Sequence, residues 1–281
     1  AATAGSVLAQ DTIGLYTNKA GTNTELNLSG ARSFSLYLVV HEPSREEYID
    51  SWECAVATSP GLFFIGLELY ENGINLSTAP NFVVDCHLRL WAQGTILARL
   101  DYLAIDTLPY DFYLTGTSPS SVVPAAPCYR PNLYGADYVP LTPSSGSSAA
   151  PVFRLNAHAP ATITVQADGS GDYPTIQDAI DNARGGDTIL LGDGTYTGPG
   201  NRDIDCNGLP VTIRSASNDP EACVIDCENQ GRGMNMILGE GVMTVLQGVT
   251  IANGNTLGQS DGGGLRIGIY GGGETRPRIH N

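Results

Sequence analysis

Two aspartates in a recurring tripeptide are the clearest candidates for a charged site. The tripeptide Ile-Asp-Cys contains Asp205 at its first occurrence and Asp226 at its second. If the recurrence marks one turn of a repeating fold, the two carboxylates stack at the spacing of neighbouring strands, about 4.8 Å. Like charges at that distance repel, so a cation lies between them, one carboxylate keeps its proton, or both face water.

Calcium is the one cofactor that these acids suggest, and the solvated arrangement is favoured over it. A calcium ion would use Asp205 and Asp226, or else Asp168 and Asp172 of the DGSGD loop, because Ca²⁺ prefers carboxylate and carbonyl oxygens. Zinc is not indicated, since no histidine accompanies Cys223 and Cys227 at a zinc-site spacing.

The six cysteines suggest disulfides. Cys206 and Cys227 end the two tripeptides, and residues on neighbouring strands fall inside the Cα separation of roughly 4.4–6.8 Å that a bridge requires. Cys54 and Cys86 both alternate with apolar residues and could pair inside a first domain. Six cysteines allow many connectivities, so the other pairings stay open.

Three arginines occupy outward positions on expected strands. A line of them could bind the carboxylates of an acidic polysaccharide, although a solvated surface is the favoured interpretation. The chain contains no GxSxG, HExxH or glycine-rich phosphate loop, so nucleophilic hydrolase chemistry is not indicated. The arginines are Arg214, Arg266 and Arg278.

Composition indicates a mostly β protein that does not bind nucleic acid. Gly (34) and Pro (17) are abundant in the 281 residues, and only 15% of residues are charged, which favours turns and strands over helices. The net charge of −15 repels a phosphate backbone. No apolar stretch is long enough to insert into a membrane.

The first nine residues indicate export. AATAGSVLA is small and apolar and ends in the style of a secretory cleavage site, so residues 1–9 are interpreted as a signal-peptide remnant or an N-terminal arm. An oxidising compartment would also suit six cysteines. We therefore expect an extracellular or cell-surface protein.

Residues 10–158 are expected to form an antiparallel β-sandwich. Leu36, Leu38 and Val40 alternate with other residues, which is typical of half-buried strands, and turn signals separate several such runs. The pattern resembles the cohesin-like sandwiches of exported bacterial proteins. Residues 116–151 are rich in Pro and Ser, and we expect them to run extended over this domain.

Residues 159–281 are expected to form a right-handed parallel β-helix. Ile176, Ala179 and Ile180 fall on one face of a short helix with Thr175 as N-cap, and short, turn-separated strands follow, among them one over 244–251. We expect this solenoid either to continue beyond residue 281 or to use its last edge in assembly.

The opening VQADGSGDYPTIQDAIDNA, with the strand TILL and the turn GDGTY, resembles the entry to pectin methylesterases and pectate-lyase-like β-helices. The resemblance implies that Ile176, Ala179 and Ile180 cap the first end of the solenoid. The aspartate pair that this family uses for catalysis has no counterpart before residue 281. The chain is more similar to bacterial exported β-helix repeat proteins, which share no common catalytic machinery.

These observations favour a non-catalytic extracellular structural protein, a surface or filament-forming subunit that assembles as a homo-oligomer or homopolymer. Contacts between different surfaces of successive copies are heterologous and can grow without closing. The alternative is a carbohydrate-active enzyme or binding module, pectinesterase- or lyase-like, that acts on acidic polysaccharide.

Overall fold

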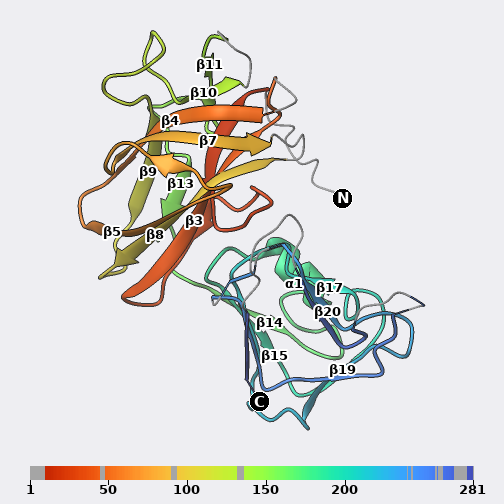
Figure 1. Cartoon of the computed structure of the whole chain (residues 1–281). Coiled ribbons are helices and arrows are strands. Elements are labelled where there is room, and N and C mark those ends of the chain that lie inside the picture. Colours follow the sequence, from red (N-terminus) through yellow and green to blue (C-terminus); the bar gives the residue numbers. More distant parts are fainter. Residues whose placement is uncertain are drawn as a thin grey trace. The chain divides into compact units, whose positions relative to one another are not determined.

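The computed structural model describes residues 10–44, 48–89, 94–131, 136–238, 240–241, 243–256, 258, 262–268 and 277–280. The expected signal remnant at 1–9 lies outside these residues. The chain forms two compact units, one from 1–24 and 30–157 and the other from 25–29 and 158–281 (Figure 1). No helix in the described ranges is both long and apolar enough to cross a membrane.

The first unit is a sandwich of two largely antiparallel sheets, which confirms the predicted fold class. One sheet follows the order β12-β1-β3-β8-β5. Strand β8 alternates buried and partly exposed residues, whereas β1 and the second half of β3 are buried on both faces. These strands are β12 (Thr142–Pro143), β1 (Thr12–Tyr16), β3 (Arg32–His41), β8 (Thr95–Ala104) and β5 (Leu62–Leu69).

The second sheet of this unit follows the order β11-β10-β4-β9-β13, while β7 also pairs with β4 and β6 pairs with β7. Phe112 of β9 lies at the centre of the core, with ring centroids 5.2 Å from Tyr102 and 5.4 Å from Phe153. The strands are β11 (Val139–Pro140), β10 (Cys128–Pro131), β4 (Tyr48–Thr58), β9 (Tyr110–Thr115), β13 (Phe153–Leu155), β7 (Asn81–Arg89) and β6 (Ile74–Asn75).

The Pro- and Ser-rich segment 116–151 does more than run over the surface. It supplies β10, which pairs with β4, and β12, which pairs in parallel with β1. Tyr129 and Leu141 of this segment are buried. The prediction that this segment only runs extended over the surface was therefore wrong, because the apolar residues between its prolines are buried in the core.

The second unit is a parallel β-solenoid, as predicted. Its strands form three sheets that every turn of the chain visits in succession, and all pairs between turns are parallel. The first sheet contains β14 (Thr162–Val165), β15 (Thr188–Leu191), β18 (Thr212–Ser215), β21 (Val245–Gln247) and β24 (Arg278–His280). The second contains β16 (Gly194–Tyr196), β19 (Cys223–Asp226) and β22 (Thr250–Ala252). The third contains β17 (Ile204–Asp205), β20 (Met234–Met236) and β23 (Leu265–Ile267).

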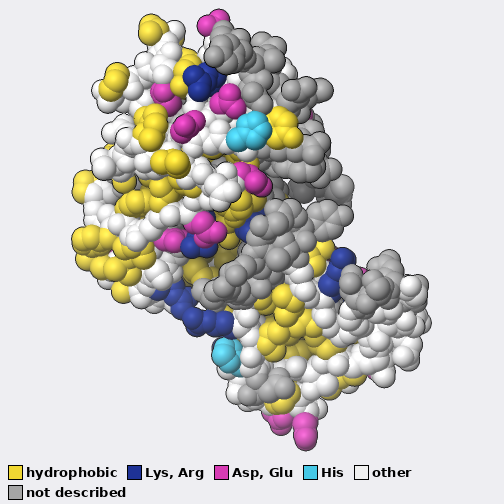
Figure 2. Space-filling model, in the orientation of Figure 1, with side chains coloured by type: hydrophobic (Ala, Val, Ile, Leu, Met, Phe, Trp, Pro, Cys, Tyr) yellow, Lys and Arg dark blue, Asp and Glu magenta, His cyan; other side chains and the backbone are white. Residues whose placement is uncertain are grey.

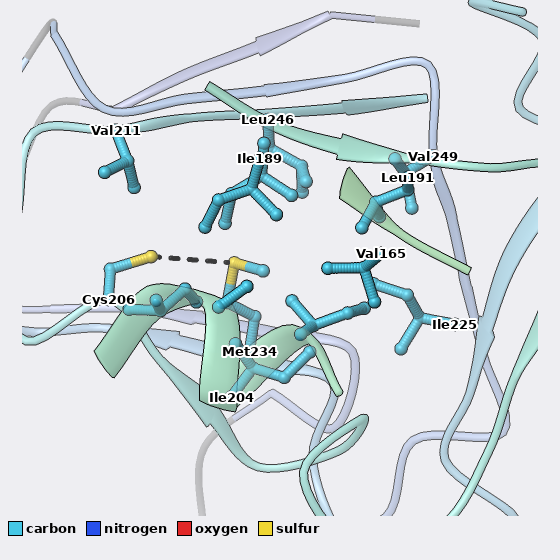
Figure 3. Packing of buried hydrophobic residues seen from close by; sticks show 14 of the residues in the cluster. Val165, Ile189, Leu191, Ile204, Cys206, Val211, Ile225, Met234, Leu246 and Val249 are labelled. Carbon is cyan, nitrogen blue, oxygen red and sulfur yellow. Dashed lines mark hydrogen bonds between the residues drawn. The ribbon is translucent and has the colours of Figure 1, made fainter. Parts of the chain in front are cut away.

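Stacked apolar side chains fill the interior of the solenoid. Ile189, Ile213 and Leu246 occupy equivalent positions on β15, β18 and β21 and form one buried column. In Figure 3, Ile189 and Leu246 point toward the same interior as Ile204 and Met234, which come from the third sheet. Each turn therefore buries its inward residues against those of the next turn.

The predicted strand over 244–251 is two strands with a corner between them. Gly248 has φ +63, a left-handed conformation that favours glycine, and the chain passes there from β21 to β22. A Cβ at this position would lie 2.9 Å from Ser215 Oγ. Alternation alone could not reveal this change of sheet, because the inward residues continue on both sides of the corner.

Helix α1 (Ile176–Asn182) packs against β14, β15 and β17, so it caps the first turn as expected. Its buried residues are the predicted Ile176, Ala179 and Ile180. Thr175 is the N-cap and accepts a hydrogen bond from the Asp178 N–H.

Candidate functional site

The predicted stack of Asp205 on Asp226 is not formed. Asp205 pairs with Asn235 in the third sheet, whereas Asp226 pairs with Ala252 in the second. The two Ile-Asp-Cys tripeptides therefore lie on different sheets of the solenoid and are not one full turn apart. They resemble each other because inward and outward residues alternate in the same way on both sheets. The two carboxylates therefore cannot form the cation site that stacking would have made.

Both aspartates instead cap the turns that follow their strands. An Asp205 carboxylate oxygen accepts the Asn207 N–H at 2.8 Å. An Asp226 oxygen accepts the Glu228 N–H at 2.9 Å and the Asn253 side-chain amide at 2.9 Å. The bond from the Glu228 N–H lowers the pKa of Asp226 most, and the bond from Asn253 lowers it further. The Asn253 bond also joins one turn of the solenoid to the next.

The DGSGD loop uses its acids in the same way. Asp168 accepts the Ser170 hydroxyl at 2.6 Å and the Ser170 N–H at 3.0 Å. Asp172 accepts the Thr164 N–H and hydroxyl, both at 2.7 Å. These bonds lower the pKa of each carboxyl. Across the described ranges, no three His, Cys, Asp or Glu side chains gather to hold a metal ion.

The two predicted disulfides are absent, since all six cysteines are free thiols. Cys206 follows β17 in the third sheet and Cys227 follows β19 in the second, so they are not stacked neighbours. In the first unit Cys54 lies opposite Phe82 rather than Cys86. Both proposed pairings assumed a register that the sheets do not have.

The thiols of the solenoid are core residues. Cys206 is fully buried and its sulfur lies 4.0 Å from the sulfur of Met234 (Figure 3). Burial raises its pKa, and burial likewise raises the pKa of Cys223 to about 11. Because the thiolate is the reactive form, burial disfavours reaction at Cys206 and Cys223.

The three arginines do not form a line. Arg214 and Arg278 lie in the first sheet, but Arg214 stacks between Leu190 and Gln247, while Arg278 stacks on Val245. Arg266 lies in the third sheet and stacks on Asn235. An extended row of guanidinium groups for a polyuronate is therefore not present.

A buried carboxylate that sequence reasoning missed lies in the first unit. Glu53 of β4 is only 5% exposed and accepts hydrogen bonds from the Thr117 hydroxyl and the Ser121 N–H, both at 3.1 Å, and from the Ser121 hydroxyl. Cys128 Sγ lies 3.9 Å from the same carboxylate, and burial raises the pKa of this thiol to about 12. The cluster fastens the start of the Pro- and Ser-rich segment to β4.

A second buried carboxylate, Glu240, closes a turn of the solenoid. It accepts the Gly208 N–H at 3.0 Å and the Leu238 N–H at 2.9 Å, and burial raises its pKa. Alternation gave no signal for either glutamate. Glu53 stands beside buried Trp52, and its partners Thr117 and Ser121 belong to the distant Pro- and Ser-rich segment.

Comparisons with known proteins concern the first unit. No family model and no curated protein matches the chain. Among solved structures it is similar to a cohesin module of a Clostridium perfringens family 33 glycoside hydrolase, at 8% identity and TM-score 0.33, over 46% of this chain and 88% of that one. It is also similar to the third ScaB cohesin of R. flavefaciens, solved with a group 1 dockerin, at 11% identity and TM-score 0.35, over 54% and 99%. The seventh ScaB type I cohesin of Pseudobacteroides cellulosolvens matches at 10% identity and TM-score 0.26, over 39% and 81%. By its own strand topology, the chain combines a β-sandwich with a parallel β-solenoid.

Proposed function

We propose that the protein is a non-catalytic extracellular structural subunit that assembles with copies of itself, head to tail, into a surface layer or filament. One observation carries this proposal. Phe63 and Ile65 of the edge strand β5 expose 53% and 55% of their surface, and Ile74 and Leu76 at β6 expose 63% and 67%. Large exposed apolar patches on globular proteins mark interaction sites.

The exposed pair Phe63 and Ile65 on β5, which we call the apolar patch, suits contact between proteins. Figure 2 shows hydrophobic side chains gathered on the side of the first unit where β5 lies. A register shift between Phe64 and Gly66 interrupts the regular pairing of β5. Because bulges hinder simple extension of a sheet, association would use the apolar side chains rather than add a strand to the edge.

A second exposed apolar pair, Ile74 of β6 and the adjacent Leu76, lies beside the other sheet of the first unit. Two different apolar surfaces on one chain are what a heterologous contact needs, because such a contact joins one surface to another and repeats without closing. The carboxylates of Asp168, Asp172, Asp205 and Asp226 already accept hydrogen bonds from groups of their own unit. Their use in stabilising turns also favours a structural role.

The test is self-association of the purified chain, measured by size-exclusion chromatography with light scattering and by negative-stain electron microscopy. We expect oligomers or filaments that increase with salt, because a net charge of −15 on every copy repels at low ionic strength. The double variant Phe63→Lys/Ile65→Lys should remain monomeric.

The matched control is Val123→Lys, since Val123 is 97% exposed and lies outside the patch. It should associate as the wild type does. Monomers alone at every concentration and salt would contradict the proposal, and release of methanol or of unsaturated product from pectin would favour the carbohydrate-active alternative instead.

A further inference from the structure

The chain contains two Asn-x-Ser tripeptides, the acceptor pattern for N-linked glycans. They are Asn27-Leu28-Ser29 and Asn75-Leu76-Ser77, which are identical in sequence. The pattern alone therefore does not distinguish them. The structure does, because an acceptor asparagine has to present its side-chain nitrogen to an enzyme and to a bulky sugar donor.

Asn27 is closed to such chemistry. It follows strand β2 (Glu25–Leu26) and exposes only 2% of its surface. Its side-chain nitrogen donates to the Gly185 carbonyl at 3.1 Å, and its side-chain oxygen accepts the His158 N–H at 3.1 Å. A sugar on this nitrogen would disturb a buried hydrogen bond and would need space that the buried side chain does not have.

Asn75 is held in a different way. It ends strand β6, which pairs with β7. Its side-chain oxygen accepts three hydrogen bonds at 3.3 Å, from the Ser77 N–H, the Ser77 hydroxyl and the Val83 N–H. Its side-chain nitrogen donates to no group in the described part of the chain, and it is not among the buried polar atoms that lack a partner there. The bonds that fix this side chain thus use its oxygen and leave its nitrogen to solvent.

The sequence on either side of Asn75 is exposed as well. Residues 71–72 and 78–80 are exposed, and the neighbours Ile74 and Leu76 expose 63% and 67% of their surface. An enzyme that recognises a tripeptide needs access to a stretch of chain rather than to one side chain. The β6–β7 hairpin provides that access.

We propose that Asn75, and not Asn27, is an N-glycosylation site, and that a glycan there closes the surface of Ile74 and Leu76 to self-association. This inference rests on the extracellular, self-associating role proposed above. The donor is an oligosaccharide carried on a lipid diphosphate. Asn75 Nδ2 forms a bond to the anomeric carbon of the sugar and loses one proton, while the bond from that carbon to the diphosphate breaks and the diphosphate leaves with the electron pair.

The closing of the surface follows from the chemistry of the two groups. A glycan is bulky and solubilising, whereas association through Ile74 and Leu76 requires their apolar surface to leave water. The sugar would be attached to the residue between these two side chains, so a second chain would meet the hydrated glycan first. Glycan occupancy would therefore decide which copies associate through this surface, while the apolar patch on β5 carries no acceptor asparagine.

The first test is modification of the folded chain. Purified, unmodified full-length protein is incubated with a single-subunit oligosaccharyltransferase and a lipid-diphosphate-linked oligosaccharide, and the products are mapped by peptide mass spectrometry. We expect one glycan per chain, on Asn75. Synthetic peptides of residues 22–32 and 70–80 should both be modified, because both contain the tripeptide without the fold. A glycan on Asn27 of the folded chain, or none on Asn75 while the 70–80 peptide reacts, would overturn the proposal.

Two variants of the second tripeptide are the matched controls. Asn75→Asp keeps an oxygen that can accept the three hydrogen bonds but removes the acceptor nitrogen, so it should fold and carry no glycan. Ser77→Thr keeps the hydroxyl and should be modified as the wild type is. A glycan on the Asn75→Asp chain, or none on the Ser77→Thr chain, would contradict the assignment.

The second test separates this inference from the proposed function. We expect the glycosylated chain to need on the order of tenfold higher concentration than the unmodified chain for half-maximal association in light scattering. The Asn75→Asp chain should associate equally before and after enzyme treatment. Equal association of the wild type with and without the glycan would overturn the closing of the surface. An unmodified chain that stays monomeric would overturn the proposed function, and the acceptor role of Asn75 would stand on the first test.

Discussion

The two units bury their cores through different kinds of neighbour. In the sandwich, β4 pairs with β7, β9 and β10, so its partners come from distant parts of the sequence. In the solenoid, β18 pairs with β15 and β21, the strands one turn before and one turn after it. Repeat architectures depend on such nearest-neighbour contacts, whereas a sandwich depends on side chains from two sheets that interdigitate.

The difference explains where polar groups are tolerated inside each unit. The sandwich buries Glu53 under a segment that arrives late in the chain and brings Thr117 and Ser121 as partners. The solenoid buries Glu240 under its own adjacent turns, with Gly208 and Leu238 as partners. In both units a buried carboxylate persists because N–H or O–H groups satisfy it.

The largest expected effect comes from breaking the sandwich core. Phe112→Ala removes a fully buried ring that contacts rings from both sheets and should cost about 3–5 kcal/mol. Hydrogen exchange should show lost protection in β3, β8 and β9, while Ile213 and Ile225 of the solenoid keep theirs.

The control for this change is Val123→Ala, which should alter stability by less than about 0.5 kcal/mol because the side chain is exposed. Equal loss of protection in both units would mean that they unfold together, which would contradict separate cores in the sandwich and the solenoid.

A smaller effect should come from the corner of the solenoid. Gly248→Ala forces a side chain into a left-handed conformation and against Ser215 and Asn218, at an expected cost of about 1–3 kcal/mol. Denaturant unfolding monitored by exchange at β21 and β22 would measure it. Gly241→Ala, in a turn of the same unit, is the matched control, and an equal loss there would refute the role of the corner.

The smallest effect concerns pH. Because burial raises the pKa of Glu240, the folded chain retains this proton at a pH where the unfolded chain has released it. The contribution of this group to the free energy of unfolding is therefore highest below its unfolded pKa and falls as pH rises through the folded pKa. Glu240→Gln should flatten that part of the stability profile relative to wild type. A profile with an unchanged slope would show that Glu240 titrates normally.

Several parts of the fold could be predicted because the signal is local. Thr175, Ile176, Ala179 and Ile180 define a short amphipathic helix by their spacing alone, and the structure places them as expected. Strand β15 has the predicted bounds, Thr188–Leu191. Alternation and capping involve residues only two to four positions apart, so they leave a pattern in the sequence.

The candidate sites failed because they required a register. Asp205 with Asp226, and Cys206 with Cys227, were paired by a tripeptide that repeats on two sheets of the solenoid. Each turn visits three sheets and repeats the same inward and outward pattern on each of them. Sequence similarity therefore does not identify the residue one full turn away, whereas the backbone hydrogen-bond pairing does identify it.

The sequence by itself determined the strand-rich composition, the inward and outward faces, the short helix and the two kinds of domain, because each depends on composition or on neighbours along the chain. Only the tertiary structure decided which strands stack, that Glu53 is buried, and that residues 25–29 join a unit that otherwise begins at residue 158. These features depend on segments that are far apart in the sequence. The Asn27 side chain, for example, donates a hydrogen bond to the Gly185 carbonyl. No local pattern encodes such a contact.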